Sequence, residues 1–258
     1  MKTIHVEILT PKQNSKDLDG DLERFADRFM RCMEDGHTVS IPDNPMGRPG
    51  FQATEVLLDL ELTVIPSQLL IHLNTFHTKD DLDRMIATAI EMGCRELLIV
   101  TGDGGERLSK LSPESIGVEA NSVTAVELLH YVHREYPGTF TCGVAFNPYE
   151  PQDHELEKMQ RKIDAGAAFV ITQPVTGEDA RVKELLTAFD IPVTLGVWMS
   201  KRLHLLSECI GYEIPEDQPY DPIETLRAIN ASYQDCGLYL ALLGFKTQYP
   251  MLADILGA

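Results

Sequence analysis

Eight short apolar runs recur along the chain, and a longer stretch with helical periodicity follows each of them. This alternation is the feature that most limits the possible folds. The runs are residues 4–9, 38–41, 69–73, 97–100, 142–146, 169–172, 193–197 and 238–243. Nearly every residue in them is apolar, so they predict parallel strands that are buried on both faces of a sheet.

The helical stretches between these runs complete a repeating strand–helix pattern. They are residues 18–34, 53–60, 79–92, 122–136, 153–165, 178–189, 200–210, 222–233 and 249–255. Eight such units in 258 residues match the size of a (β/α)8 barrel. The alternative, a doubly wound sheet, is disfavoured because no glycine-rich turn follows the first strand. No linker or low-complexity segment interrupts the pattern, so we expect residues 1–258 to form one barrel domain.

The charge balance excludes some classes of partner. Lys and Arg total 22 and Asp and Glu total 40, which gives a net charge of −18. A chain this acidic is unsuited to binding nucleic acid phosphates or anionic lipid surfaces. The acidity indicates either solubility or a cationic partner.

The N-terminus and the cysteines indicate a cytoplasmic protein. The first residues contain no apolar signal core, and no apolar run approaches the ~18 residues of a membrane span. The five cysteines are odd in number, widely spaced and without a CxxC pair, which favours reduced thiols. No histidines and carboxylates cluster at the spacing of metal ligands, so we expect no metal site.

Polar residues at the carboxyl ends of the predicted strands are the candidates for chemistry, because barrel enzymes carry their active sites there. Glu7 lies within the first strand between Val6 and Ile8. If the side chain points inward, partial desolvation raises its pKa and lets it hold a proton near neutral pH. The alternative is an outward or ion-paired glutamate.

Three further groups follow later strands. Thr101 to Gly105 form a glycine-rich turn in which backbone amides can approach a ligand, and Asp103 can accept hydrogen bonds from a heterocycle. Gln173 offers a donor and an acceptor to a pterin, flavin or purine, or else caps its strand. Arg161 and Lys162 can hold a phosphate, or else form a solvated helix face. Ordinary turn chemistry explains the glycines equally well.

Six segments, taken in order, resemble the methylenetetrahydrofolate reductase family. Residues 161–173, RKIDAGAAFVITQ, are similar to the family motif K-x-D-A-G-A-x-x-x-I-T-Q. The other segments are VEILTP at 6–11, IHLNT at 71–75, VTGD at 100–103, VAFNP at 144–148, and IPV with GVWMS within 191–200. The resemblance covers residues 1 to about 245.

The resemblance implies a (β/α)8 barrel that binds FAD and reduces 5,10-methylenetetrahydrofolate to 5-methyltetrahydrofolate with NAD(P)H. It implies that Glu7 is a general acid and that Asp103 acts beside the flavin and the pterin. It places Gln173, Asp103 and Phe146 at the reduced folate. It assigns a set of residues to the cofactor: Ser40, His72, Asn74, Thr101, Gly102, Asp103, Asn121, Ser122, Arg161 and Lys162.

Departures from the family pattern keep other functions open. Thr101 replaces an arginine, Asn121 and Ser122 replace a Tyr-Ala pair, and Glu150 stands where histidine is common. FAD would then bind weakly, be replaced by another flavin, or be absent. The alternatives are a diverged one-carbon or pterin enzyme, or a flavin-free pterin-binding subunit that works with a partner protein. A homo-oligomer and a protein electron donor are both compatible with the sequence.

Overall fold

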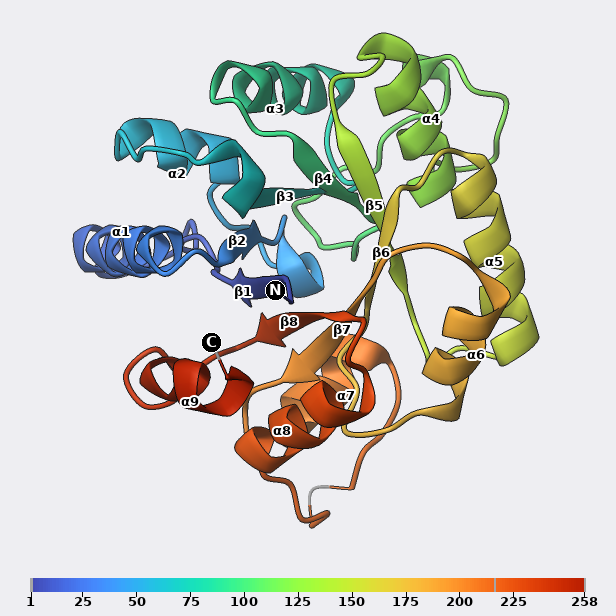
Figure 1. Ribbon diagram of the computed structural model, residues 1–258. Coiled ribbons are helices and arrows are strands. Elements are labelled where there is room, and N and C mark those ends of the chain that lie inside the picture. The colour runs from blue at the N-terminus through green and yellow to red at the C-terminus, as the bar shows by residue number, and fades with distance from the viewer. Residues whose placement is uncertain (1, 216, 258) are drawn as a thin grey trace. The chain divides into compact units, whose positions relative to one another are not determined.

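Eight parallel strands form a closed barrel in chain order, from β1 to β8 (Figure 1). The computed structural model describes residues 2–215 and 217–257. The strands are β1 (Ile4–Glu7), β2 (Thr38–Ile41), β3 (Leu69–Leu73), β4 (Glu96–Ile99), β5 (Thr141–Phe146), β6 (Phe169–Thr172), β7 (Val193–Trp198) and β8 (Gly237–Ala241). The predicted (β/α)8 barrel is therefore confirmed.

Helices alternate with these strands, and two helices separate β7 from β8. The α-helices are α1 (Leu18–Glu34), α2 (Ala53–Asp59), α3 (Lys79–Glu91), α4 (Ala125–Glu135), α5 (Gln152–Asp164), α6 (Ala180–Ala188), α7 (Leu203–Ile210), α8 (Pro222–Ser232) and α9 (Leu252–Leu256). Short 3-10 turns are η1 (Pro45–Gly47), η2 (Pro66–Gln68), η3 (Glu114–Ile116) and η4 (Tyr249–Met251).

Side-chain caps fix where several helices begin. The Thr78 side chain accepts a hydrogen bond from the backbone N–H of Asp81 and so caps α3. Thr124 and Glu127 form a capping box at the start of α4. Because this box satisfies backbone N–H groups of the first turn, α4 begins at Ala125, later than the predicted residue 122.

Three strands end earlier than their apolar runs predicted, β4 by one residue and β1 and β8 by two residues each. β1 ends at Glu7, and Leu9 is exposed. β8 ends at Ala241 because Leu242 has a left-handed backbone with φ of 56°. A non-glycine residue in this region is unusual and interrupts regular strand geometry.

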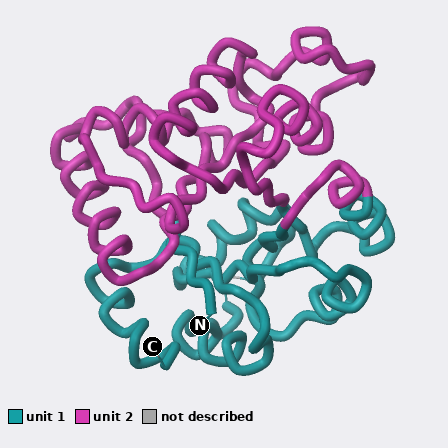
Figure 2. The backbone as a smooth tube through the Cα atoms, turned by 45° about the horizontal axis from the view of Figure 1, so that its top comes forward, with its two compact units in different colours: residues 1–7, 145–160, 169–258 teal, residues 8–144, 161–168 magenta. Residues whose placement is uncertain are grey.

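The chain divides into two compact units (Figure 2). Unit 1 comprises residues 1–7, 145–160 and 169–258, and it contains β1, β6, β7 and β8. Unit 2 comprises residues 8–144 and 161–168, and it contains β2, β3 and β4.

The strand register of unit 1 separates two faces of the sheet. Leu240 pairs with Val6 on one side and with Val197 on the other. These three side chains form an aliphatic row on one face, and α8 packs against β7. Tyr239 pairs with His5 and Gly196. Because side chains alternate along a strand, this second, more polar row points away from the aliphatic row and into the barrel.

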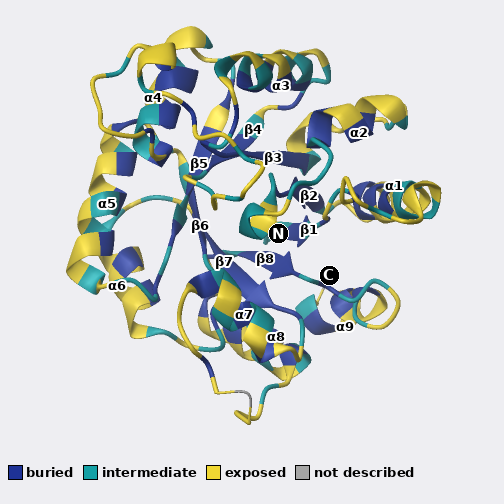
Figure 3. Cartoon of the chain, turned by 180° about the vertical axis from the view of Figure 1, so that it is seen from behind, coloured by how far each residue is buried: buried dark blue, intermediate teal, exposed yellow. Residues whose placement is uncertain are grey.

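Buried side chains lie mainly on the strands, and exposed ones lie on the outer faces of the helices (Figure 3). In unit 2, all residues of β2 and β3 are buried. Four of the five cysteines are buried. No helix among the described residues is long and apolar enough to cross a membrane.

Candidate active site

The predicted acid and two predicted substrate residues all belong to unit 1. Glu7 is the last residue of β1, Phe146 is the last residue of β5, and Gln173 directly follows β6. All three are therefore at carboxyl ends of strands, where barrel enzymes carry their chemistry.

Glu7 is a desolvated carboxyl group with two hydrogen-bond donors. The hydroxyl of Tyr239 donates to Glu7 Oε2 at 2.8 Å, and the backbone N–H of Leu242 also donates to the carboxyl. Both bonds favour the ionised form, but burial has the larger effect and raises the pKa of Glu7 above its usual range. The raised pKa predicted from the position within an apolar strand is confirmed.

His5 supplies no positive charge to this carboxyl group. Its ring stacks on Tyr239 with 6.4 Å between ring centroids. Burial lowers the pKa of His5 to about 4, so the imidazole is neutral at physiological pH. The carboxyl of Glu7 is therefore tuned by burial, a hydroxyl and a backbone N–H.

Gln173 presents a side-chain amide with no partner among the described residues. Its backbone N–H donates to the carbonyl oxygen of Phe146 at 2.8 Å, which fixes the backbone at the end of β6. The side chain is half-buried and makes no hydrogen bond within residues 2–215 and 217–257. Phe146 is completely buried.

The sequence did not indicate Tyr239 or Leu242 as functional residues. Both lie in an apolar run that reads as an ordinary buried strand. A tyrosine in such a run is a usable signal, because its hydroxyl needs a hydrogen-bond partner when buried. Nothing local in the sequence indicates the left-handed backbone at Leu242.

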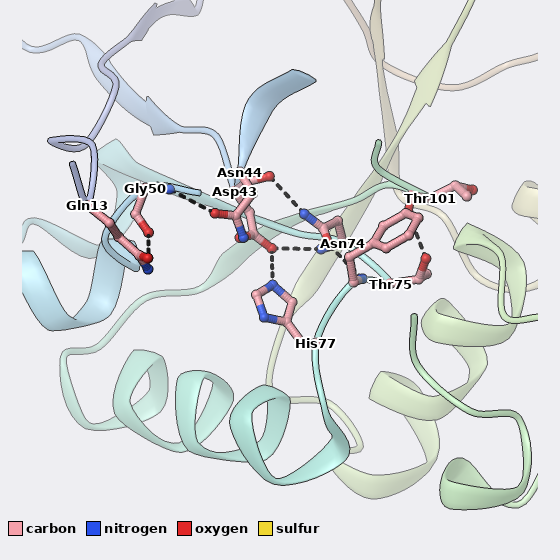
Figure 4. A network of polar contacts seen from close by, with 9 residues as sticks. Gln13, Asp43, Asn44, Gly50, Asn74, Thr75, His77 and Thr101 are labelled. Carbon is pink, nitrogen blue, oxygen red and sulfur yellow. Dashed lines mark hydrogen bonds and ion pairs between the residues drawn. The ribbon is translucent and has the colours of Figure 1, made fainter. Parts of the chain in front are cut away.

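In unit 2, a polar network joins the segments that follow β2 and β3 (Figure 4). The Asp43 carboxylate is 2.6 Å from His77 Nε2 and accepts a hydrogen bond from the backbone N–H of Asn74. The Asn74 side chain donates to the Asp43 carbonyl oxygen and accepts from the backbone N–H of Phe76. Asn74, predicted to contact a cofactor, is therefore a structural member of this network.

Ser40 and His72 form a second buried pair in unit 2. Ser40 Oγ lies 2.9 Å from His72 Nε2 across β2 and β3. Both side chains are buried. The family resemblance implied that both residues bind the cofactor. In the structure, their side chains lie within hydrogen-bond distance of each other.

The turn at Thr101–Asp103 is bonded to neighbouring loops. The Thr101 carbonyl oxygen accepts from the Thr75 hydroxyl at 2.7 Å, and Thr101 Oγ1 accepts from the backbone N–H of Ala125. Asp103 Oδ2 accepts from the backbone N–H of Met46 at 3.1 Å. The carboxylate expected to receive hydrogen bonds from a heterocycle receives one from the chain itself.

The glycines of this turn allow two backbones to approach closely. A Cβ on Gly47 would lie 2.2 Å from the carbonyl oxygen of Gly104, and one on Gly105 would lie 2.3 Å from that of Gly47. A Cβ on Gly102 would lie 2.6 Å from Asn74 Cβ. The close approach predicted for a ligand is therefore made by the protein's own loops.

The remaining cofactor candidates are spread over unit 2. Asn121 and Ser122 are exposed in the loop before α4. Arg161 is exposed near the end of α5, whereas its neighbour Lys162 is buried. The two basic residues thus do not form one phosphate-binding pair at the surface.

These contacts test whether the residues present fit FAD. Asn74, Thr101 and Asp103 form hydrogen bonds with residues of neighbouring segments. Those partners are Asp43, Met46, Thr75, Phe76 and Ala125. Several groups that would hold a flavin at this turn are therefore already bonded to the chain itself, while Thr101 and Asp103 stay exposed.

The barrel is similar to solved barrel enzymes at low sequence identity. A 2,3-dimethylmalate lyase has a TM-score of 0.55 at 9% identity, with 100% of this chain and 80% of the other covered. An oxaloacetate acetylhydrolase has a TM-score of 0.54 at 11% identity, with 98% and 79% covered. At these identities the likeness shows the fold alone.

Sequence comparison points to one family. A Saccharomyces cerevisiae protein named methylenetetrahydrofolate reductase 2 is 28% identical over 127 residues, which are 45% of this chain and 20% of the relative. Methylenetetrahydrofolate reductase 1 of Schizosaccharomyces pombe is 29% identical over 97 residues, 36% of this chain and 15% of that protein. The matched segments thus span a fifth or less of these relatives.

The family model described as methylenetetrahydrofolate reductase matches residues 3–216. This stretch contains Glu7, the turn at 101–103 and Gln173, and it covers far more than half of the chain. The chain therefore belongs to the methylenetetrahydrofolate reductase family.

Proposed function

We propose that this chain is an oxidoreductase that reduces 5,10-methylenetetrahydrofolate to 5-methyltetrahydrofolate with electrons from NAD(P)H, and that residues 1–258 act as one catalytic barrel domain. The observation that carries the proposal is the Glu7 carboxyl group, which burial keeps protonated to higher pH than usual. A barrel needs no such acid for its own stability, because desolvating a carboxyl group costs free energy.

Glu7 acts as the general acid of the reaction. The bond between the methylene carbon and N10 of the folate breaks, its electron pair stays on N10, and Glu7 gives N10 a proton. The methylene group is left as an iminium on N5. Hydride from the dihydronicotinamide adds to that carbon, so N5 carries a methyl group and the nicotinamide is oxidised.

Tyr239 and Leu242 prepare Glu7 for this step. Their donors hold the carboxyl group in one orientation, and they stabilise the carboxylate that remains after proton transfer. The partnerless amide of Gln173 binds the donor and acceptor edge of the pterin.

The proposed reaction has no flavin step. Asp103 and its neighbours bind other loops of unit 2, so no residue of that turn is assigned to FAD. Hydride passes directly between the nicotinamide and the folate, both of which bind as substrates. We propose a soluble cytoplasmic enzyme that assembles as a homo-oligomer.

The Glu7→Gln variant tests the proposed acid. Gln keeps the volume of Glu and can still accept from Tyr239, so the site keeps its shape. We expect a loss of about 10²–10⁴-fold in the rate of 5-methyltetrahydrofolate formation, the usual contribution of a general acid. Binding of the folate should change much less.

Glu96→Gln is the matched control. Glu96 is also a strand carboxylate whose pKa is raised by burial, but it begins β4 instead of ending a strand. It is therefore at the end of the barrel away from the chemistry. Equal activity losses in the two variants would contradict the role of Glu7, and a wild-type chain without folate reduction would contradict the proposed reaction.

A second candidate function is a pterin-binding subunit that receives electrons from a partner protein. The contacts between Asp103 and Met46 favour it, because they use groups that would hold a cofactor. The two functions differ in one measurement. The isolated chain reduces the folate with NAD(P)H if it is the complete enzyme, and it only binds the folate if it is the subunit.

A further inference from the structure

Trp198 is a buried hydrogen-bond donor without an acceptor. Its side chain is 2% exposed, and Nε1 has no hydrogen-bond partner in the described part of the chain. An indole nitrogen can only donate. Leaving such a group unpaired costs free energy, so an unpaired N–H in a folded protein calls for an explanation.

The backbone around Trp198 is held firmly. The hydroxyl of Tyr220 donates to the Trp198 carbonyl oxygen at 2.5 Å. The next residue, Met199, donates its N–H to the Ala241 carbonyl oxygen and accepts from the side-chain amide of Gln248. These bonds fix the backbone at the end of β7, from which the indole projects.

The register places Trp198 on the same face as the proposed acid. Trp198 pairs with Ala241, two residues after Tyr239, and Glu7 is two residues after His5. With a side-chain period of two, these positions project from one face of β1, β7 and β8. Trp198, Ala241 and Glu7 are each the last residue of their strand, and Gln173 directly follows β6.

We propose that the indole N–H of Trp198 donates a hydrogen bond to an acceptor atom of the reduced pterin that Glu7 protonates. Trp198 is then a specificity-determining residue, because the site rejects heterocycles that lack an acceptor at this point. This inference rests on the proposed function. The pterin acceptor supplies the hydrogen-bond partner that Trp198 Nε1 lacks within the described residues. Trp198 contributes only a donor, whereas the amide of Gln173 can bind both donors and acceptors.

Alternative explanations of the N–H are less favourable. If Trp198 served only the core, a phenylalanine would fill much of the same space without an unpaired donor. The neighbouring groups on its face are a neutral His5, the hydroxyl of Tyr239, which is already donated to Glu7, and the Glu7 carboxyl group. None of them is bonded to Nε1.

Binding of 5-methyltetrahydrofolate without nicotinamide tests the proposal. Trp198 is the only tryptophan of the chain, so its fluorescence reports directly on this position. We expect the folate to change the emission of the wild type. In calorimetry, we expect Trp198→Phe to bind the same folate roughly ten-fold more weakly, the effect of one lost hydrogen bond.

A sulfur isostere separates binding from stability. Replacing Trp198 with 3-benzothienylalanine removes the N–H and keeps the bicyclic shape. We expect the ligand-free protein to keep or gain thermal stability, because an unpaired donor is removed, while folate binding weakens as in the phenylalanine variant. A loss of ligand-free stability would show a structural partner for the N–H and would overturn the proposal.

The outcomes distinguish the two levels of inference. Equal folate affinity in the wild type and in both variants would overturn the role of Trp198 and leave the proposed function intact. No binding of 5-methyltetrahydrofolate to the wild type in calorimetry would overturn the proposed function itself, and with it the role of Trp198.

Discussion

Replacing Tyr239 with phenylalanine removes one hydroxyl group and keeps the aromatic ring. That hydroxyl donates to Glu7 Oε2 at 2.8 Å. Such a bond contributes ~1.5–3 kcal/mol to stability when the acceptor is charged and ~0.5–1.5 kcal/mol when it is neutral. The cost of Tyr239→Phe therefore depends on whether Glu7 is ionised.

The sign of the pH dependence follows from the raised pKa of Glu7. Between the unfolded and folded pKa values, the folded protein binds the extra proton, so its stability falls as the pH rises through that window. Tyr239→Phe removes a bond that favours the ionised form, so the fall becomes steeper. We expect a destabilisation of ~1 kcal/mol on the acid side and ~2 kcal/mol on the alkaline side.

Urea unfolding of both proteins at several pH values from about 5 to about 9 measures this difference. Tyr233→Phe is the control, because the Tyr233 hydroxyl bonds to the backbone of Asp179 and its loss should cost the same at every pH. In a Glu7→Gln background, the pH dependence of Tyr239→Phe should vanish. An equal cost at all pH values in the wild-type background would refute the bond to an ionised Glu7.

Two further predictions concern the contact between the loops of unit 2. Gly47→Ala places a Cβ 2.2 Å from the Gly104 carbonyl oxygen at a φ of 65°, so thermal unfolding should show a loss of ~3 kcal/mol. Gly36→Ala has a similar φ of 76° but meets nothing within 4 Å; its loss should be only ~1–2 kcal/mol, and equal losses would argue against the loop contact. FAD added to the purified protein should keep the fluorescence and visible spectrum of free flavin, because Asp103 is bonded to Met46. Flavin bands that bleach with NADH and return with methylenetetrahydrofolate would contradict this and restore a flavin step.

The sequence predicted the barrel well because its signals are local. An apolar run bounded by polar residues defines a buried strand, and β2, β3 and β6 have the predicted limits. The desolvation of Glu7 was predictable for the same reason, since its two neighbours in the strand are apolar. These properties depend on a few adjacent residues and hardly on the rest of the chain.

The glycine-rich turn shows where local signals are insufficient. Glycines at 102, 104 and 105 indicate that something approaches the backbone closely, and the sequence alone suggested a ligand. The structure identifies the neighbours as Gly47 and Asn74, from segments distant in the chain. No pattern within the turn distinguishes a ligand from a second loop, so this part of the site required the structure.

The end of β8 links the largest error of strand prediction to the proposed chemistry. Residues 238–243 are all apolar and predicted a strand that continues to Leu243. The chain instead turns at Leu242, with a left-handed backbone that costs a leucine ~1–2 kcal/mol. The strained turn directs the Leu242 N–H to the Glu7 carboxyl group. Tertiary structure can override the preferred backbone conformation of a residue where a functional site needs a particular geometry. A simple strand pattern therefore fails at Leu242 because the tertiary structure, and not the local apolar run, sets the backbone there.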